Sequence, residues 1–397
     1  MSDENGMMIA NEKTDHHEVE SMEQLLDIID PLVPPRFRGL SMSIYIEAGR
    51  THEEALAARI RFKSAVLDRR AELRDEERYK EESAAMLDPA MELIDDRKFW
   101  DHQRGGLAYL ATADGALSIQ CACRFPTMSL FGGDYHLLPM LQAAATARRF
   151  YLLGLSEGAV FLRRVSDLGE EAVHGVPDSF AQALAHAGFQ KSRIEEKEFS
   201  NQNNRATEHS LQALRVIDEA VRRAIPDQQD PLLVAAVEFV GDEYSRVCEY
   251  PNLVEARLEG DPERMPVSDL ADEARRVMKP VFAASDRERG EHAAALLEAN
   301  PSLTLTELPA IVRAASNANI ASLTVAAGTD CLAGYSRGYP TRGDRGFPPH
   351  LRCDLVDFAA RQTLTTGGEL VIVGNSDLPA DSPVIAETRW TPVNRRQ

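Results

Sequence analysis

The chain has 397 residues, enough for two or three domains, and a formal net charge of −19. Such an acidic surface excludes nucleic-acid binding by bulk attraction, so any contact with RNA requires a local basic patch. No apolar run approaches the roughly 20 residues that span a bilayer, and the first residues lack the pattern of a secretory signal. We therefore expect a cytoplasmic protein with neither a membrane nor a DNA partner.

The start of the chain predicts an acidic tail followed by a small domain. Residues 1–20 are polar and weakly patterned, which is typical of a disordered tail. A first domain is expected over residues 21–128, where Thr51 and Glu54 have the spacing of a helix capping box. Its predicted elements are a helix at 21–29, a strand at 40–46, helices at 51–80 and 82–95, and strands at 105–112 and 116–124.

The long helix that begins at Thr51 is the first locally basic element. Between Arg59 and Lys80 it carries eight Lys and Arg residues against five acids. One interpretation is a solvated helix stabilised by ion pairs one turn apart. The other is an RNA contact, for which Arg61 and Lys63 are the candidates.

A second domain is expected over residues 129–228. It begins where a helix at 137–147 leads into a hairpin of strands at 150–155 and 159–164. A strand at 171–176 and a helix at 177–186 follow. The next segment, 187–209, has too few apolar residues to form a core and predicts a long polar surface loop. A helix with an apolar stripe at Leu211, Leu214, Ile217, Val221 and Ile225 closes the domain.

The third domain is expected over residues 229–397. Its first segment, 232–240, is a continuous apolar run that predicts a strand covered on both faces. Helices are predicted at 242–249, 268–299, 306–315 and 354–365, and further strands at 320–326 and 369–373. This alternation indicates an α/β sandwich, so the predicted fold class of the chain is α/β.

Residues 334–352 form the most RNA-like segment of the chain. They contain four arginines against one acid, with aromatic residues between them. Guanidinium groups and aromatic rings can stack on unpaired bases, which makes Arg337, Arg342 and Arg345 candidate RNA ligands. The alternative is a Gly/Pro-rich loop that arginine keeps in solution.

None of the sequence motifs that accompany catalysis or cofactor binding indicates a reaction for this chain. Residues 154–158 match G-x-S-x-G, but a hydrolase nucleophile elbow needs a helix after the serine, and the residues after Ser156 have a strand pattern. No phosphate loop, dinucleotide-binding motif or zinc-ligand spacing is present. Cys121 and Cys123 are expected to be reduced core residues. We predict no catalytic residue, no metal and no cofactor.

Stretches from all three predicted domains resemble one family. These are SMSIYIEAGR, IRFKSAVLDRRAEL, RRFYLLGLSEGAVFLRRV and LVDFAARQTLTTGGELVIVG. They are similar to bacterial relatives of the archaeo-eukaryotic class 1 release factors, which group with Pelota-like proteins and the hibernation factor Balon. The resemblance spans about residues 38–390. It implies an N-terminal α/β decoding domain, an RNase H-like middle domain and a C-terminal α/β sandwich like kink-turn-binding ribosomal proteins.

The chain departs from the family at two functional motifs. Release factors carry Gly-Gly-Gln in the middle-domain loop, whereas residues 187–209 offer only Gly188-Phe189-Gln190. At the position of the decoding motif Asn-Ile-Lys-Ser, the chain has Arg61-Phe62-Lys63-Ser64. Peptide release and stop-codon reading are therefore not expected.

These observations predict a non-catalytic factor that binds the ribosome in or near the aminoacyl-tRNA site. Hibernation and rescue of stalled ribosomes are the roles that the resemblance implies, with rRNA and a translation factor as partners. The candidate RNA-binding residues are Arg61, Lys63, Gln190, Lys191, Arg193, Arg337, Arg342 and Arg345. The alternatives are a protein-binding scaffold of the same fold and a serine hydrolase that uses Ser156.

Overall fold

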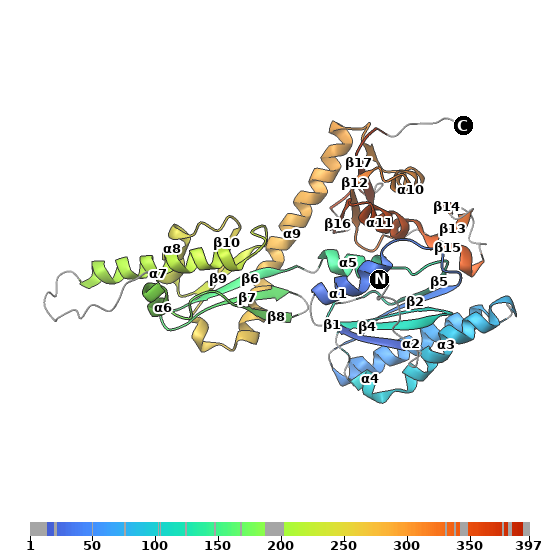
Figure 1. The fold of residues 1–397 in the computed structure, drawn as a ribbon, viewed down its shortest axis with the longest axis horizontal. Helices are drawn as coiled ribbons and strands as arrows, with labels where there is room; N and C mark the ends of the chain where they lie inside the picture. Colours follow the sequence, from blue (N-terminus) through green and yellow to red (C-terminus); the bar gives the residue numbers. More distant parts are fainter. Residues whose placement is uncertain are drawn as a thin grey trace, which may run out of the picture. The chain divides into compact units, whose positions relative to one another are not determined.

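The computed structural model divides the chain into two compact units (Figure 1). The split unit comprises Met1–Ala147 and Ser285–Gln397, and the middle unit comprises Arg148–Ala284. The structure describes residues 14–19, 22–49, 51–74, 77–101, 103, 105–123, 125–146, 148–166, 169–186, 202–329, 332–336, 339–341, 348–374, 377–379 and 383–391.

The first sheet of the split unit has five strands in the order β1-β4-β3-β2-β5. The strands are β1 (Thr14–Val19), β2 (Ser41–Glu47), β3 (Gly106–Thr112), β4 (Gly115–Cys121) and β5 (Met128–Gly132). The helices of this region are α1 (Met22–Ile29), α2 (His52–Glu72), α3 (Lys80–Asp95), α4 (Arg97–Asp101) and α5 (Leu138–Thr146), with short turns η1 (Asp30–Leu32) and η2 (Glu77–Tyr79). Figure 1 shows α2, α3 and α4 on one side of the sheet, where Phe62, Trp100 and Tyr109 share one core.

Part of the N-terminal segment is a strand, so the prediction of a disordered tail over residues 1–20 is wrong for residues 14–19. Residues 14–19 form β1, which pairs in parallel with β4 from Thr14↔Ala116 to Val19↔Cys121. Thr14 and Val19 are buried, and the His16 Nδ1 lies 2.6 Å from the Ser118 hydroxyl. The strand was missed because only its two ends are buried. Residues 1–13 and 20 lie outside the described part.

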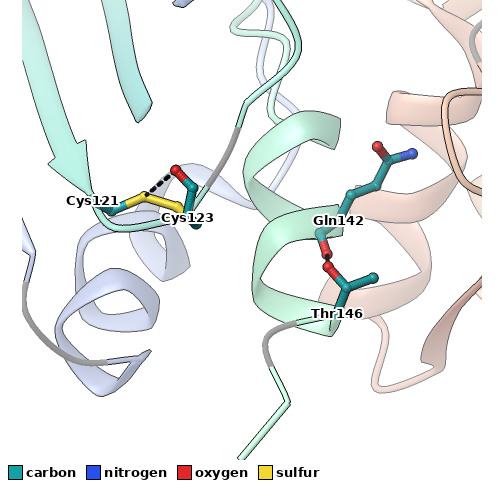
Figure 2. The surroundings of a disulfide bond; sticks show 4 residues. All are labelled: Cys121, Cys123, Gln142 and Thr146. Carbon is teal, nitrogen blue, oxygen red and sulfur yellow. Dashed lines mark hydrogen bonds between the residues drawn. A yellow bond between two sulfur atoms is a disulfide. The ribbon is translucent and has the colours of Figure 1, made fainter. Parts of the chain in front are cut away.

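Cys121 and Cys123 form a disulfide (Figure 2), which contradicts the prediction of reduced core cysteines. β4 ends at Cys121 and the chain bends over the next two residues. Because the bend brings the Cα atoms to 5.3 Å, the spacing suits a disulfide. Figure 2 also shows the Thr146 hydroxyl of α5 donating to the Gln142 carbonyl at 2.7 Å.

The second sheet of the split unit is mixed and has the order β11-β17-β12-β16. Its strands are β11 (Thr304–Leu305), β12 (Ile320–Ala326), β16 (Glu369–Val373) and β17 (Val384–Thr388), accompanied by α10 (Leu308–Ser316) and α11 (Leu355–Thr365). A small sheet of β13 (Leu332–Ser336), β14 (Tyr339–Thr341) and β15 (Arg352–Asp354) follows the order β14-β13-β15, and η4 (Pro349–Leu351) precedes β15. Ala293 of α9 (Val267–Ala299) packs against Ala326 and Val371 of the four-stranded sheet.

The middle unit has a five-stranded sheet in the order β10-β9-β6-β7-β8. Its elements are β6 (Phe150–Leu155), β7 (Val160–Ser166), β8 (Gly169–Val173), α6 (Phe180–His186), α7 (Gln202–Ala224), β9 (Leu232–Ala236), α8 (Glu238–Val247), β10 (Leu253–Glu259) and η3 (Pro262–Arg264). Leu153 and Val234 pack with α7, whereas their neighbours Leu152 and Leu233 pack with the first half of α9. Helices therefore cover both faces of the sheet, and the predicted α/β class is confirmed.

The two units differ from the predicted domain boundaries at 128/129 and 228/229. β9 was assigned to the third domain, but it pairs in parallel with β6 from Tyr151↔Leu232 to Leu155↔Ala236. The apolar run correctly predicted a strand buried on both faces, but it carries no information about which sheet holds that strand. The predicted 51–80 helix is also shorter, because α2 ends at Glu72.

A buried arginine joins the two halves of the split unit. Arg361 of α11 is 1% exposed, and its guanidinium donates to the carbonyl oxygens of Val33 and Tyr135 at 2.9 and 2.8 Å. It also pairs with the carboxylates of Asp134 at 2.7 Å and Asp357 at 3.3 Å. The C-terminal helix is thereby fixed to segments that precede it by more than two hundred residues.

Asp357 extends this contact to the start of α5. Its Oδ1 accepts hydrogen bonds from the backbone N–H groups of Leu137 and Leu138 at 2.7 and 2.6 Å. Those N–H groups have no partner within their own helix, so a carboxylate from α11 caps α5.

Candidate nucleic-acid interface on the split unit

Helix α2 begins with the predicted capping box. The Thr51 hydroxyl accepts from the Glu54 N–H at 3.3 Å, and the Glu54 carboxylate accepts from the Thr51 N–H at 2.9 Å. The helix buries one face, made of Ala55, Ala58, Phe62, Ala65 and Val66. Because this face lies against the core, the side chains on the opposite face point to solvent.

The exposed face of α2 combines apolar and basic side chains. Leu56, Ile60 and Leu67 are 50%, 61% and 41% exposed. Lys63 and Arg70 are also exposed, and the spacing of the five residues places them along one side of the helix. We call these five residues the α2 stripe.

The two described RNA-binding candidates occupy different environments. Arg61 is half-buried, and its guanidinium donates to the Glu47 carbonyl at 2.5 Å, which ties α2 to the end of β2. Lys63 is exposed. The other candidates, Gln190, Lys191, Arg193, Arg337, Arg342 and Arg345, lie outside the described residues.

The end of α2 meets the last residues of the arginine-rich stretch 334–352. Glu72 lies between Arg69, at 2.6 Å, and Arg352 of β15, with which it forms an ion pair. The Tyr79 hydroxyl contacts the His350 Nδ1, and the two rings lie 5.5 Å apart. The structure therefore joins the two basic regions that the sequence identified separately, at a contact we call the η4 junction.

The η4 junction also packs tightly against β5. The Gly133 N–H donates to the Arg352 carbonyl at 2.8 Å. A Cβ at Gly133 would lie 2.7 Å from the His350 carbonyl oxygen, closer than real Cβ contacts. Only glycine allows this approach of the two backbones.

Charge at the η4 junction is arranged so that cations face outward. Burial, and then the neighbouring Arg78 guanidinium, lower the pKa of His350 below its ordinary value, so a neutral ring contacts Tyr79. Arg70, Arg74 and Arg78 are exposed around the end of α2. Cations at a helix C-terminus interact favourably with its dipole, and exposed guanidinium groups can bind phosphates. We call these three residues the arginine cluster.

The environment of Ser156 is that of a turn residue. Its Oγ accepts from the Ala159 N–H at 2.9 Å, and β7 starts directly afterwards at Val160. A nucleophile elbow requires a helix at this point. The structure therefore does not favour the hydrolase interpretation.

Within the described ranges, no three His, Cys, Asp or Glu side chains are grouped so that they could hold a metal ion. None of the helices in the same ranges has the length and apolar character needed to cross a membrane.

Comparison with known proteins gives one family match. Residues 149–319 match the model described as "Bacterial archaeo-eukaryotic release factor family 3". The match covers nearly all of the middle unit and continues to the start of β12. No curated protein matches the chain.

Several solved structures align with most of the chain at low sequence identity. A model of ribosome-bound archaeal Pelota and ABCE1 is 12% identical, with a TM-score of 0.41, and the alignment covers 94% of this chain and 96% of that one. Dom34 of S. cerevisiae, described as a translation termination-like factor, is 9% identical over 76% and 78%, with a TM-score of 0.33. The archaeal termination factor aRF1 is 10% identical over 94% and 99%, with a TM-score of 0.23.

Proposed function

We propose that this chain is a bacterial archaeo-eukaryotic release factor-like protein and that it acts as a translation factor that binds the ribosome. The observation that carries the proposal is the family match over the middle unit. The split unit supports it, because an acidic chain nevertheless exposes a compact set of cations. On a molecule with a net charge of −19, RNA is attracted to these cations and repelled by the rest of the surface, so the cations determine which face of the protein meets RNA.

The proposed contact with rRNA is Lys63 together with the arginine cluster. Arg70, Arg74 and Arg78 present planar guanidinium groups that can bind phosphates bidentately or stack on bases. The exposed apolar members of the α2 stripe lie beside them and can pack against sugars or unpaired bases. Arg61 is a weaker candidate, because its guanidinium already binds the Glu47 carbonyl.

The proposed action is occupancy of the aminoacyl-tRNA site without catalysis. Family members that release peptides use Gly-Gly-Gln in the middle domain, and no Gly-Gly pair occurs between His186 and Gln202. A protein that fills the site and leaves the nascent peptide attached suits hibernation or the rescue of stalled ribosomes. We also predict that a translation factor binds the protein as a second partner.

Pelleting with purified 70S ribosomes tests the proposal. We expect the protein to sediment with ribosomes. The double variant Lys63→Glu, Arg70→Glu should lose roughly tenfold or more in affinity, because two phosphate contacts are lost. The affinity of this variant should also depend less on salt concentration. The matched control is Arg223→Glu, Arg276→Glu, which makes the same charge change at exposed positions of the middle unit.

Absence of the wild-type protein from ribosomal pellets at both low and moderate salt would reject ribosome binding. That result would favour the protein-binding scaffold instead. Equal losses in the two double variants would assign the effect to net charge and reject the α2 contact.

A further inference from the structure

Exposed apolar side chains gather at one end of the middle sheet. β6, β9 and β10 are parallel, so their carboxyl ends lie at the same edge. Val237, Phe239 and Met265 follow these strands and are 43%, 62% and 43% exposed. They are three of the nine large apolar residues that are exposed in the described part of the chain. We call residues 156–159, 237–239 and 259–265 the carboxyl edge.

Contacts between the loops hold the carboxyl edge together. The Gly260 N–H donates to the Ala236 carbonyl at 3.2 Å, which joins the ends of β10 and β9. The Glu263 carboxylate contacts the Ser156 hydroxyl, which joins η3 to the turn between β6 and β7. The apolar side chains are thus presented by a connected surface.

Acidic residues surround the apolar side chains of this edge. Glu157, Glu238, Glu259 and Glu263 are all exposed there. The one nearby exposed cation of the three loops, Arg264, is paired with Asp261 at 3.2 Å. RNA would be repelled by this surface, whereas a segment that carries Lys or Arg would be attracted.

The carboxyl edge and the α2 stripe are opposites in charge. Both expose three large apolar residues, but the α2 stripe adds Lys63 and Arg70, whereas the edge adds four glutamates and a single exposed cation, Arg264, which is paired with Asp261. One ligand class cannot satisfy both surfaces. Exposed apolar groups ringed by polar residues are characteristic of protein-binding sites.

We propose that the carboxyl edge docks a protein segment that combines basic residues with apolar side chains. Phe239 is the central anchor, since it is the most exposed of the large apolar residues described and aromatic residues dominate binding energy at such sites. Glu157 and Glu238 select the basic residues of the partner. The proposal goes beyond ribosome binding by the split unit and does not depend on it.

Photo-crosslinking from position 237 tests the proposal. Val237 is replaced by p-benzoylphenylalanine in the full chain, which is irradiated with purified 70S ribosomes and, separately, with a ribosome-depleted cell extract. The crosslinked peptide is mapped by mass spectrometry. We expect a protein segment of net positive charge with apolar residues, and a yield that falls at least tenfold in Glu157→Lys, Glu238→Lys and in Phe239→Ser.

Two controls isolate the surface. The double variant Glu219→Lys, Glu249→Lys makes the same charge change at exposed positions elsewhere on the middle unit and should keep the yield. The crosslinker at exposed Trp390, in the split unit, should not give the same peptide. If Phe239→Ser alters the thermal unfolding curve, Met265→Ser replaces it.

Crosslinks to RNA, to a second copy of this chain, or to an acidic segment would overturn the proposal. A yield that survives reversal of Glu157 and Glu238, or that never exceeds the Trp390 control, would do the same. The two ideas remain distinguishable. A crosslink to a basic protein segment, without pelleting of the protein with ribosomes, would reject only ribosome binding. Pelleting with ribosomes, without a crosslink from position 237, would reject only the proposed docking at the carboxyl edge.

Discussion

Arg361 is a buried charge that links distant segments of the split unit. It is an arginine in a fully buried position whose charge is matched by Asp134 and Asp357. The Asp357–Arg361 spacing predicts an ion pair within one helix. The partners at Val33, Asp134 and Tyr135 could not be predicted, because nothing in the sequence near Arg361 indicates which distant segment provides its hydrogen-bond acceptors.

Replacement of Arg361 by Met should lower the free energy of unfolding of the split unit by about 3–5 kcal/mol, because two carboxylates lose their buried partner. Chemical denaturation measures this loss. Arg313→Met, at an exposed position of α10, is the control and should change stability by less than about 0.5 kcal/mol. A loss of less than about 1 kcal/mol for Arg361→Met would contradict the structural role of the arginine.

His350 should make the split unit sensitive to acid. Its pKa in the folded state is lowered, so the native state binds fewer protons than the unfolded state between that value and the ordinary value of about 6.5. Stability therefore rises with pH through this window and is lost as pH falls. His350→Gln should be less sensitive than wild type in melts at pH 5 and pH 7.5. An identical pH dependence in both proteins would reject the assignment.

At the scale of elements, the sequence predicts the long periodic segments well and their pairing poorly. α9 and β12 lie where the patterns placed them, because α9 has apolar residues at helical spacing and β12 is a short segment rich in apolar residues. The edge strands β1, β5 and β10 were missed, because they are short or have mixed burial. β17 was also missed, although it lies between β11 and β12. β9 was recognised as a buried strand but placed in another domain, because partner choice depends on contacts across the chain.

Gly290 shows how closely α9 is packed. A Cβ at this position would lie 2.3 Å from the Asp377 carbonyl oxygen. Gly→Ala inside a helix normally stabilises by roughly 0.5–1 kcal/mol, but here the helix or the loop has to move. We expect Gly290→Ala to destabilise the split unit by about 1–3 kcal/mol in thermal or chemical unfolding.

The matched substitution is Gly241→Ala in α8. Its Cβ would meet the guanidinium of Arg257, which is the end of a flexible side chain and can shift. This variant should lose less stability than Gly290→Ala or gain some. The reverse order would show that α9 does not approach the Asp377 loop as closely as described.

At the scale of the whole molecule, charge separates two kinds of exposed apolar surface. The α2 stripe is basic and adjoins the arginine cluster, whereas the carboxyl edge of the middle unit is acidic. Composition alone revealed only the net charge of −19. The sequence predicted the basic character of α2 and of residues 334–352. Their meeting at the η4 junction depends on Glu72, Tyr79 and His350, whose role could not be predicted from local pattern.

The most direct measurement is a cryo-EM reconstruction of purified 70S ribosomes that carry peptidyl-tRNA and have been incubated with the protein. We expect bound protein, with Lys63 and the arginine cluster against rRNA and the peptide still attached to its tRNA. Ribosomes with no bound protein, or bound protein whose peptide has been released, would contradict it.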